Sequence, residues 1–281
     1  MPTIDDLPQI SAIIKEHGLN AKKSLSQNFL LDLNLTSKIA RLDKDYSLGS
    51  ILEVGPGPGG LTRALLAETN KKIYVLEKDE RCIPILNQIS DYYPGRLEIF
   101  LGDALSSPIL SQIPSPIHIF SNLPYNIGTE LLTRWLDPPN WPPEWTTLTL
   151  MFQAEVAERI IAKPGSKNYG RLSILAQWRS KAKITMRLPP EAFTPIPKVH
   201  SAVVRIERLE KPIHKANSKI LISIVASAFN QRRKMIRSSL KNRINNLEVV
   251  LEKANITPTK RAGDITIEEY CCLSRIVESL Q

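Results

Sequence analysis

The chain has little of what disulfide scaffolds and metal sites require. Its 281 residues include three cysteines, of which Cys271 and Cys272 are sequence neighbours that cannot form an unstrained disulfide. The four histidines are scattered, and neither residue type has the spacing of metal ligands. The sequence therefore predicts reduced thiols and no metal site.

Long apolar runs are also missing. No stretch approaches the length needed to cross a bilayer, and the first ten residues contain Asp5 and Asp6 in place of a basic segment followed by an apolar one. We therefore expect a cytoplasmic protein without membrane contact. The chain is long enough to bury one large domain and a smaller one.

Glycine is sparse, with 12 residues in all, yet four of them fall within residues 55–60, after a short apolar run. Their spacing fits the G-x-G-x-x-G pattern of dinucleotide-binding loops. However, Pro56 and Pro58 remove two of the backbone N–H donors that a pyrophosphate needs. The loop therefore argues against a nicotinamide-dependent oxidoreductase and favours S-adenosylmethionine, which needs close backbone approach but has no pyrophosphate.

Acidic residues lie within or follow three successive predicted strands. Glu53 lies two residues before Gly55, Glu77 ends the next apolar run, and Asp103 follows the run after that. We expect them near the methionine ammonium, the ribose and the adenine amine of the cofactor. Each alone is more typical of a helix cap or a solvated loop than of a ligand site. Together they indicate one site, because ligands of open α/β sheets bind at the carboxyl ends of the strands.

A tetrapeptide suited to an exocyclic amine, Asn122, Leu123, Pro124 and Tyr125, follows the buried run 117–120. The Asn122 side-chain oxygen and the Leu123 carbonyl can each accept one N–H of a nucleobase amine and localise the lone pair on its nitrogen. Pro124 fixes the turn, and Tyr125 offers a flat face for base stacking. An ordinary turn after a strand is the alternative for this segment taken alone.

Strands and helices alternate to about residue 135, which predicts an α/β fold. We expect a Rossmann-like methyltransferase sheet that is mostly parallel, with residues 183–188 and 201–208 as an antiparallel edge. Only helical periodicity remains after residue 212. The predicted domains are a methyltransferase domain, residues 1–209, with a basic helical extension in 1–45, and a small all-helical RNA-binding domain, residues 210–281.

Positive charge is concentrated in that second part. The net charge is +9, and residues 211–281 carry 13 Lys and Arg against 6 Asp and Glu. Six basic residues fall within residues 232–243, among them Arg232, Arg233 and Lys234, on a predicted helix whose other face is buried through the apolar run 220–229. A solvated helix face is the alternative, but this concentration favours a polyanionic partner.

Five motifs together resemble the small-subunit ribosomal RNA adenine dimethyltransferases over roughly residues 10–275. They are residues 22–30, the loop 53–59, the tetrapeptide 122–125, residues 193–201 and residues 229–234. The resemblance implies two methyl transfers to N6 of each of two adjacent adenosines in the 3′-terminal hairpin loop of small-subunit RNA, with a role in small-subunit biogenesis. It also implies the cofactor-contacting positions Asn28, Leu30, Gly55, Glu77, Asp103 and Asn122. Ser26 departs from the family's usual glycine and bears on the local turn at Asn28 and Leu30.

The resemblance also directs attention to residues outside the cofactor loop. Phe193 would stack on the target base opposite Tyr125, or else serve as an ordinary core residue. Lys22, Lys23 and Lys198 are expected to contact RNA phosphates together with the basic cluster. The expected partner is small-subunit RNA within a precursor particle, bound by a monomer.

Two other functions remain open at this stage. A large-subunit RNA adenine methyltransferase of the antibiotic-resistance type has the same Asn-x-Pro-Tyr chemistry. The chain could also act primarily as a ribosome-assembly factor that binds immature small subunits. A DNA adenine methyltransferase is disfavoured because no candidate target-recognition domain is visible beyond the basic C-terminal residues.

Overall fold

The structure, a computed structural model, describes residues 7–19, 28–42, 48–122 and 125–280. Two compact units are each described by themselves. The first comprises Met1–Leu132, Pro143–Ala157 and Lys183–Glu207, and the second comprises Thr133–Pro142, Glu158–Ala182 and Arg208–Gln281. No helix in the described part of the chain is long and apolar enough to cross a membrane.

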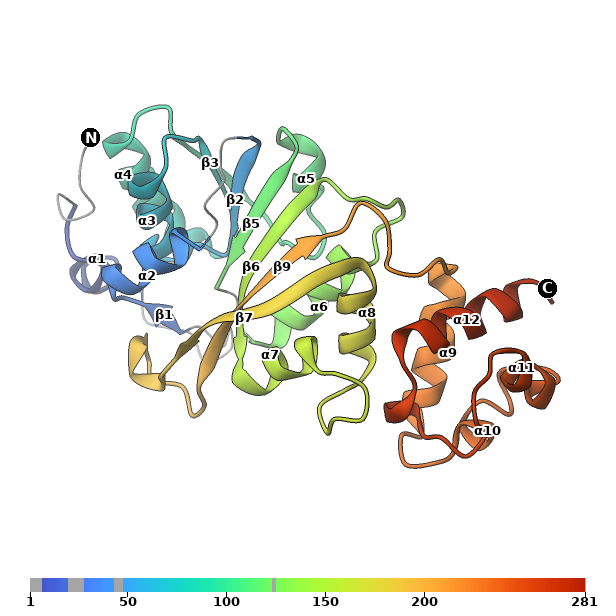
Figure 1. Ribbon diagram of the computed structural model, residues 1–281. Coiled ribbons are helices and arrows are strands. Elements are labelled where there is room, and N and C mark those ends of the chain that lie inside the picture. The colour runs from blue at the N-terminus through green and yellow to red at the C-terminus, as the bar shows by residue number, and fades with distance from the viewer. Residues whose placement is uncertain (1–6, 20–27, 43–47, 123–124, 281) are drawn as a thin grey trace. The chain divides into compact units, whose positions relative to one another are not determined.

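The first unit is built on a seven-stranded sheet with the order β4-β3-β2-β5-β6-β9-β7 (Figure 1). Neighbouring strands from β4 to β6 pair in parallel, and β6 pairs with β9 antiparallel. The predicted fold class, a mostly parallel sheet with an antiparallel edge, is confirmed. The strands are β2 (Ser50–Val54), β3 (Ile73–Glu77), β4 (Leu97–Leu101), β5 (Ile117–Ser121), β6 (Trp145–Gln153), β7 (Ser180–Leu188) and β9 (Ser201–Arg208).

Four helices of this unit share a hydrophobic core with one face of the sheet. Ile51 and Val75 of the sheet belong to the same buried cluster as Ile39, Leu65 and Leu86 of the helices. The Asp32 side chain caps the helix Leu33–Ala40 by accepting from the backbone N–H groups of residues 34 and 35. The helices are α1 (Ile10–Glu16), α2 (Leu33–Ala40), α3 (Gly60–Glu68) and α4 (Ile83–Tyr92); α5 (Ile109–Gln112), α6 (Tyr125–Leu136) and α7 (Ala154–Ile161) follow later strands.

A small second sheet joins two segments that are far apart in the sequence. β1 (Phe29–Leu30) pairs antiparallel with β8 (Phe193–Thr194), with Leu30 opposite Phe193. The short helix η4 (Pro190–Ala192) leads into β8. The pairing therefore brings the predicted cofactor-contacting segment and the predicted base-stacking segment side by side.

The described residues of the second unit are mainly helical, and they also include the start of β7 and the last residue of β9. The helices that lie wholly within this unit are α8 (Arg171–Arg179), α9 (Ser218–Asn230), α10 (Ile236–Ser239), α11 (Leu247–Lys253), η5 (Ala262–Asp264) and α12 (Ile267–Glu278). Asn217 caps α9, whose buried stripe runs from Ile220 to Ala228. α9 lies beside α12 (Figure 1). The sequence patterns did not predict α8. The functional division at residue 209 stays a prediction, and the compact unit also includes residues 158–182.

The prediction of a helix through the basic cluster is wrong. α9 ends at Asn230, residues 231–234 form a turn, and only Arg237 of the cluster lies within a helix, the short α10. Residues 231–235 are all exposed. Residues 231–234 offer no apolar side chain for a continued helix to bury, and Arg233 and Arg237 would lie four residues apart on such a helix as a like-charge pair.

Candidate functional site

A cavity of about 470 Å³ lies where β2, β3, β4 and β5 end. This volume is within the range of small-molecule sites. The cavity brings together eight residues that the sequence singled out, although they come from six separate segments of the chain. They are Asn28, Leu30, Glu53, Gly55, Glu77, Asp103, Asn122 and Phe193.

The glycine loop after β2 needs conformations that other residues avoid. Gly55 has φ 72° and Gly57 has φ 55°, both in the left-handed region. The Gly55 N–H donates to the Leu76 carbonyl at 2.9 Å, which ties the loop to the end of β3. A β-carbon on Gly57 would lie 3.3 Å from the Phe29 ring. The loop is therefore held close to both the sheet and the segment that enters β1.

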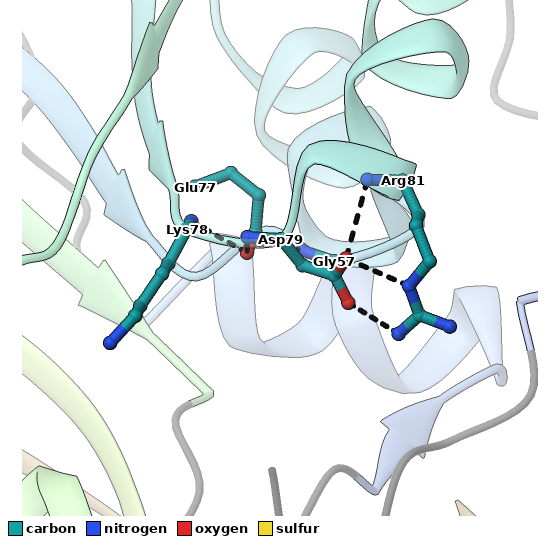
Figure 2. Close-up of polar contacts among 5 residues, drawn as sticks. All are labelled: Gly57, Glu77, Lys78, Asp79 and Arg81. Carbon is teal, nitrogen blue, oxygen red and sulfur yellow. Dashed lines mark hydrogen bonds and ion pairs between the residues drawn. The ribbon is translucent and has the colours of Figure 1, made fainter.

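Glu77 lies at the centre of the hydrogen bonds around this loop (Figure 2). Its Oε2 atom accepts from the Gly57 N–H at 2.9 Å, and its Oε1 atom accepts from the N–H groups of Lys78 and Asp79, each at 2.8 Å. Burial raises the pKa of Glu77, while these hydrogen bonds oppose the rise. Oε2 keeps a second acceptor site, so the group can also accept from a ribose hydroxyl.

The turn after β3 is fixed by its own side chains. Asp79 accepts from the Arg81 backbone N–H at 3.2 Å and pairs with the Arg81 guanidinium at 2.5 Å (Figure 2). Lys78 reaches the end of the next strand, where its Nζ lies 2.7 Å from Oδ2 of Asp103. Oδ1 of Asp103 accepts from the Leu105 N–H at 2.9 Å. The acidic groups of β3 and β4 are thus oriented on one side of the cavity.

Glu53 is the most strongly perturbed acid of the site. It is 1% exposed, lines the cavity, and accepts a hydrogen bond from the Thr62 hydroxyl at 2.5 Å. Burial raises its pKa to about 8, the Thr62 hydrogen bond opposes the rise, and the neighbouring Glu77 adds to it. A cationic ligand group in the cavity would favour the ionised carboxylate.

Asn122 lies at the end of β5. The preceding Ser121 hydroxyl donates to the Val54 carbonyl at 2.7 Å, so the ends of β2 and β5 are joined directly beside it. The Asn122 side chain makes no hydrogen bond to the described residues. Leu123 and Pro124 lie outside the described residues, as does the side chain of Tyr125, the first residue of α6.

Phe193 forms part of the cavity wall and is also 2% exposed, within the same core cluster as Leu30. Stacking on a base therefore stays a prediction, and core packing is observed. Lys198 is exposed and is not among the cavity residues. The predicted contacts of Lys22 and Lys23, and the effect of Ser26, lie outside the described residues.

Several wall residues were not found by sequence reasoning. Phe29 and Met151 are apolar residues of strands, and Ile127 lies in the first turn of α6. No sequence signal separates them from other core positions. Lys78 was also missed, although its place directly after the acidic end of β3 is a usable signal.

The groups that line the cavity fit S-adenosylmethionine. The left-handed glycines allow close backbone approach, Glu77 and Asp103 supply acceptors for hydroxyl and amine groups, and Glu53 supplies a carboxyl group for an ammonium. Asn122 completes the edge with an acceptor for a second ligand. The arrangement suits transfer of a group between two ligands that meet in one cavity.

Comparison with known proteins agrees with this chemistry. The family model described as ribosomal RNA adenine dimethylase matches residues 18–279. The proteins named ribosomal RNA small subunit methyltransferase A from Dinoroseobacter shibae and Cereibacter sphaeroides are both 58% identical over 275 residues, which covers 98% of this chain and 98% and 99% of theirs.

Two solved structures share the fold. A dimethyladenosine transferase from Plasmodium falciparum has a TM-score of 0.76 and 24% identity, covering 88% of this chain and 96% of its own. The 23S rRNA methyltransferase ErmE has a TM-score of 0.68 and 24% identity, covering 89% of this chain and 100% of its own.

Proposed function

The chain belongs to the ribosomal RNA adenine dimethylase family, and from this premise we propose its reaction. It transfers methyl groups from S-adenosylmethionine to N6 of two adjacent adenosines in the 3′-terminal hairpin loop of small-subunit RNA. The products are N6,N6-dimethyladenosines. The observation that carries the proposal is the convergence of Glu53, Glu77, Asp103 and Asn122 on one cavity.

The cofactor-binding residues act by orientation. Glu77 accepts from the ribose, Asp103 accepts from the adenine amine, and Glu53 balances the methionine ammonium. The Gly55 loop allows the backbone to approach, and Asn28 and Leu30 close the cavity from the β1 side. When bound, S-adenosylmethionine supplies an electrophilic methyl group on a sulfonium. Positioning of this kind can supply a large part of a barrier reduction.

The target adenine is held by the tetrapeptide after β5. The Asn122 oxygen and the Leu123 carbonyl accept the two N–H groups of N6, so that its lone pair points at the methyl carbon. Pro124 fixes the turn, and Tyr125 and Phe193 stack on the ring. Bound S-adenosylmethionine would supply the methyl group, and water would take the N6 proton after the transfer, so no strong general base is required. Removing the base from its own stack costs least when the base is unpaired in a loop.

The proposed partner is small-subunit RNA within a precursor of the small subunit, bound by a monomer in the cytoplasm. The names of the 58% identical relatives support the small subunit as the target. The fold shared with ErmE does not favour the large subunit, because identity of 24% supports the fold alone. Exposed basic residues of the second unit supply a surface for phosphates.

The test is transfer of labelled methyl groups to purified small subunits that lack the modification. We expect label in N6,N6-dimethyladenosine from small subunits and none from large subunits under the same conditions. Label on large subunits alone would favour the antibiotic-resistance type of activity. A catalytically inactive variant that fully supported small-subunit maturation would favour a primary role as an assembly factor.

A further inference from the structure

Three segments of the second unit are linked into one surface. The loop 163–170 donates from its Gly165 N–H to the Gly263 carbonyl at 2.8 Å. The segment containing Gly263 is linked in turn to the turn 231–235, because Ile236 donates to the Lys260 carbonyl at 2.7 Å and Met235 forms a β-bridge with Arg261. We call the three segments, residues 163–170, 231–235 and 260–263, the three-segment surface.

Arg232 links the turn 231–235 directly to the loop 163–170. Its Nη2 atom donates to the Lys167 carbonyl at 2.6 Å and to the Ser166 carbonyl at 3.3 Å. A guanidinium has a fixed fork of donors, so two adjacent carbonyl acceptors fix both its own orientation and that of the loop. The two residues that follow, Arg233 and Lys234, form no such side-chain bonds in the described part of the chain.

Apart from these contacts of Gly165 and Arg232, the side-chain contacts of the loop lie at its buried end or within the loop itself. Tyr169 is fully buried and packs edge-on against Phe229, with ring centroids 6.3 Å apart. Ser166 donates from its hydroxyl to the Lys163 carbonyl at 2.7 Å, within the loop itself. Residues 163–167 are all exposed. Arg232 therefore supplies the side-chain contact that links the exposed half of the loop to the rest of the unit.

The exposed groups of this surface are basic. Lys163 and Lys167 of the loop, with Arg233 and Lys234 of the turn, are exposed and form no side-chain ion pair in the described part of the chain. Unpaired cations on one surface attract a polyanion, and RNA phosphates are the polyanion that the proposed function supplies.

We propose that Arg232 is a positioning residue that holds the loop 163–170, and that Lys163 and Lys167 of this loop bind RNA phosphates together with Arg233 and Lys234. The inference rests on the proposed function, and it changes the sequence-based assignment in two ways. It adds a loop that no sequence motif indicated, and it separates Arg232 from its two neighbours.

The experiment measures binding to a transcript of small-subunit RNA over a series of salt concentrations. We expect the double variant Lys163→Gln/Lys167→Gln to bind more weakly and to lower the salt slope by about 0.7–0.9 for each phosphate that is no longer neutralised. Arg233→Gln should act in the same way and should add to that effect. Arg232→Gln should weaken binding in the wild-type chain but cause little further weakening in the double variant, because it acts through the same loop.

Hydrogen exchange supplies a readout that does not depend on RNA. Arg232→Gln should speed amide exchange of residues 165–168, whereas the matched variant Arg233→Gln should leave it unchanged. Thermal unfolding confirms that each variant is folded. Unchanged exchange in Arg232→Gln, with effects on binding that simply add, would make Arg232 a direct phosphate ligand and overturn its positioning role.

An unchanged affinity and salt slope in the lysine double variant would remove the loop from the interface. This outcome, and the unchanged exchange in Arg232→Gln, count against the inference only if the wild-type chain binds the transcript and methylates small subunits. A wild-type chain that transfers no methyl group to small subunits would count against the proposed function instead.

Discussion

The Gly57 N–H donates to Oε2 of Glu77 at 2.9 Å, across the two turns that follow β2 and β3 (Figure 2). The glycine loop is thus positioned by the acid at the end of the neighbouring strand. The same carboxylate accepts two further backbone N–H groups through its other oxygen. Glu77 therefore shapes the cavity, and the proposed function gives it a second role as the acceptor for the ribose.

Replacement of Glu77 by Gln keeps the size of the side chain but removes its negative charge. One amide oxygen can keep the hydrogen bonds from Lys78 and Asp79, but the amide NH₂ would then face the Gly57 N–H, and a buried donor would be left without its acceptor. We expect the free energy of unfolding to fall by about 1–3 kcal/mol. Affinity for S-adenosylhomocysteine should fall by roughly tenfold or more, since about 1.4 kcal/mol corresponds to tenfold. Thermal unfolding and calorimetric titration measure the two effects.

The matched control is Glu98→Gln on the adjacent strand. Glu98 forms an ion pair with Lys72, but both side chains are more than 40% exposed. Such pairs contribute under about 1 kcal/mol. Comparable decreases in both variants would show that the effect of Glu77 is not specific to the cavity.

Stability should depend on pH through Glu53. Its pKa in the folded protein is about 8, against an ordinary value of 4.5, so the folded state retains a proton that the unfolded state has lost between these values. The stabilising contribution is complete below about pH 4.5 and is lost as the pH rises to about 8. Relative to Glu53→Gln, the wild-type chain should lose up to about 1.4 kcal/mol per pH unit in this window. Denaturant unfolding at several pH values checks it, and parallel curves for both proteins would contradict it.

Cofactor affinity should also depend on the protonation of Glu53, but it should rise with pH, whereas stability falls. A bound ammonium favours the ionised carboxylate, so affinity for S-adenosylhomocysteine should rise with pH towards 8 and protons should be released on binding. Glu53→Gln should flatten this dependence. Calorimetry in buffers of different ionisation enthalpy counts the released protons, and a count near zero for the wild-type chain at pH 7 would exclude the coupling.

The close approach at Gly60 should not tolerate a side chain. A β-carbon there would lie 2.8 Å from the Leu30 carbonyl oxygen, so β1 would have to shift away from the first turn of α3. We expect Gly60→Ala to lower stability by about 1–3 kcal/mol, as overpacking typically does, and to weaken cofactor binding because Leu30 lines the cavity. Gly170→Ala is a suitable control, since its β-carbon would approach no atom closer than 4.0 Å.

Most polar residues of the cavity could be predicted from the sequence because they lie at the ends of strands. Gly55, Glu77, Asp103 and Asn122 each come directly after or at the end of an apolar run, and the topology of a parallel sheet brings such ends to one edge. The pairing of β1 with β8 was not predictable from two-residue strands, because no periodicity can be read over such a length.

The basic cluster shows a different limit of prediction from sequence. Local charge density correctly located an exposed basic segment, but it gave the wrong secondary structure and treated Arg232 as equivalent to Arg233. Only tertiary structure shows that one guanidinium donates to the carbonyls of a loop 65 residues away in sequence. α8 was missed for a related reason: most of its residues are buried or half-buried, so it lacks the one-sided pattern by which helices are recognised.

Lys78 should affect cofactor binding around Asp103, where we propose that the adenine lies, without stabilising the fold. Its ion pair with Asp103 is 2.7 Å long, yet the two side chains are 65% and 33% exposed. We expect Lys78→Met to change the free energy of unfolding by less than about 1 kcal/mol and to lower cofactor affinity severalfold, because Asp103 would keep the hydrogen bond from the Leu105 N–H but lose the contact that orients its other oxygen. Arg41, which pairs with Glu68 on the surface, offers a control in Arg41→Met, where neither quantity should change appreciably.

Asn122 should matter for chemistry more than for binding. Its position is set by the bond from Ser121 to the Val54 carbonyl rather than by its own side chain, so truncation leaves the end of β5 in place. We expect Asn122→Ala to reduce methyl transfer by at least a hundredfold, as expected when one oriented acceptor of the reacting nitrogen is removed. Affinity for S-adenosylhomocysteine should fall less than tenfold. Single-turnover methylation of unmodified small subunits and calorimetry measure the two quantities. Full turnover in this variant would remove Asn122 from the mechanism, and an equal decrease of both quantities would make it a cofactor ligand only.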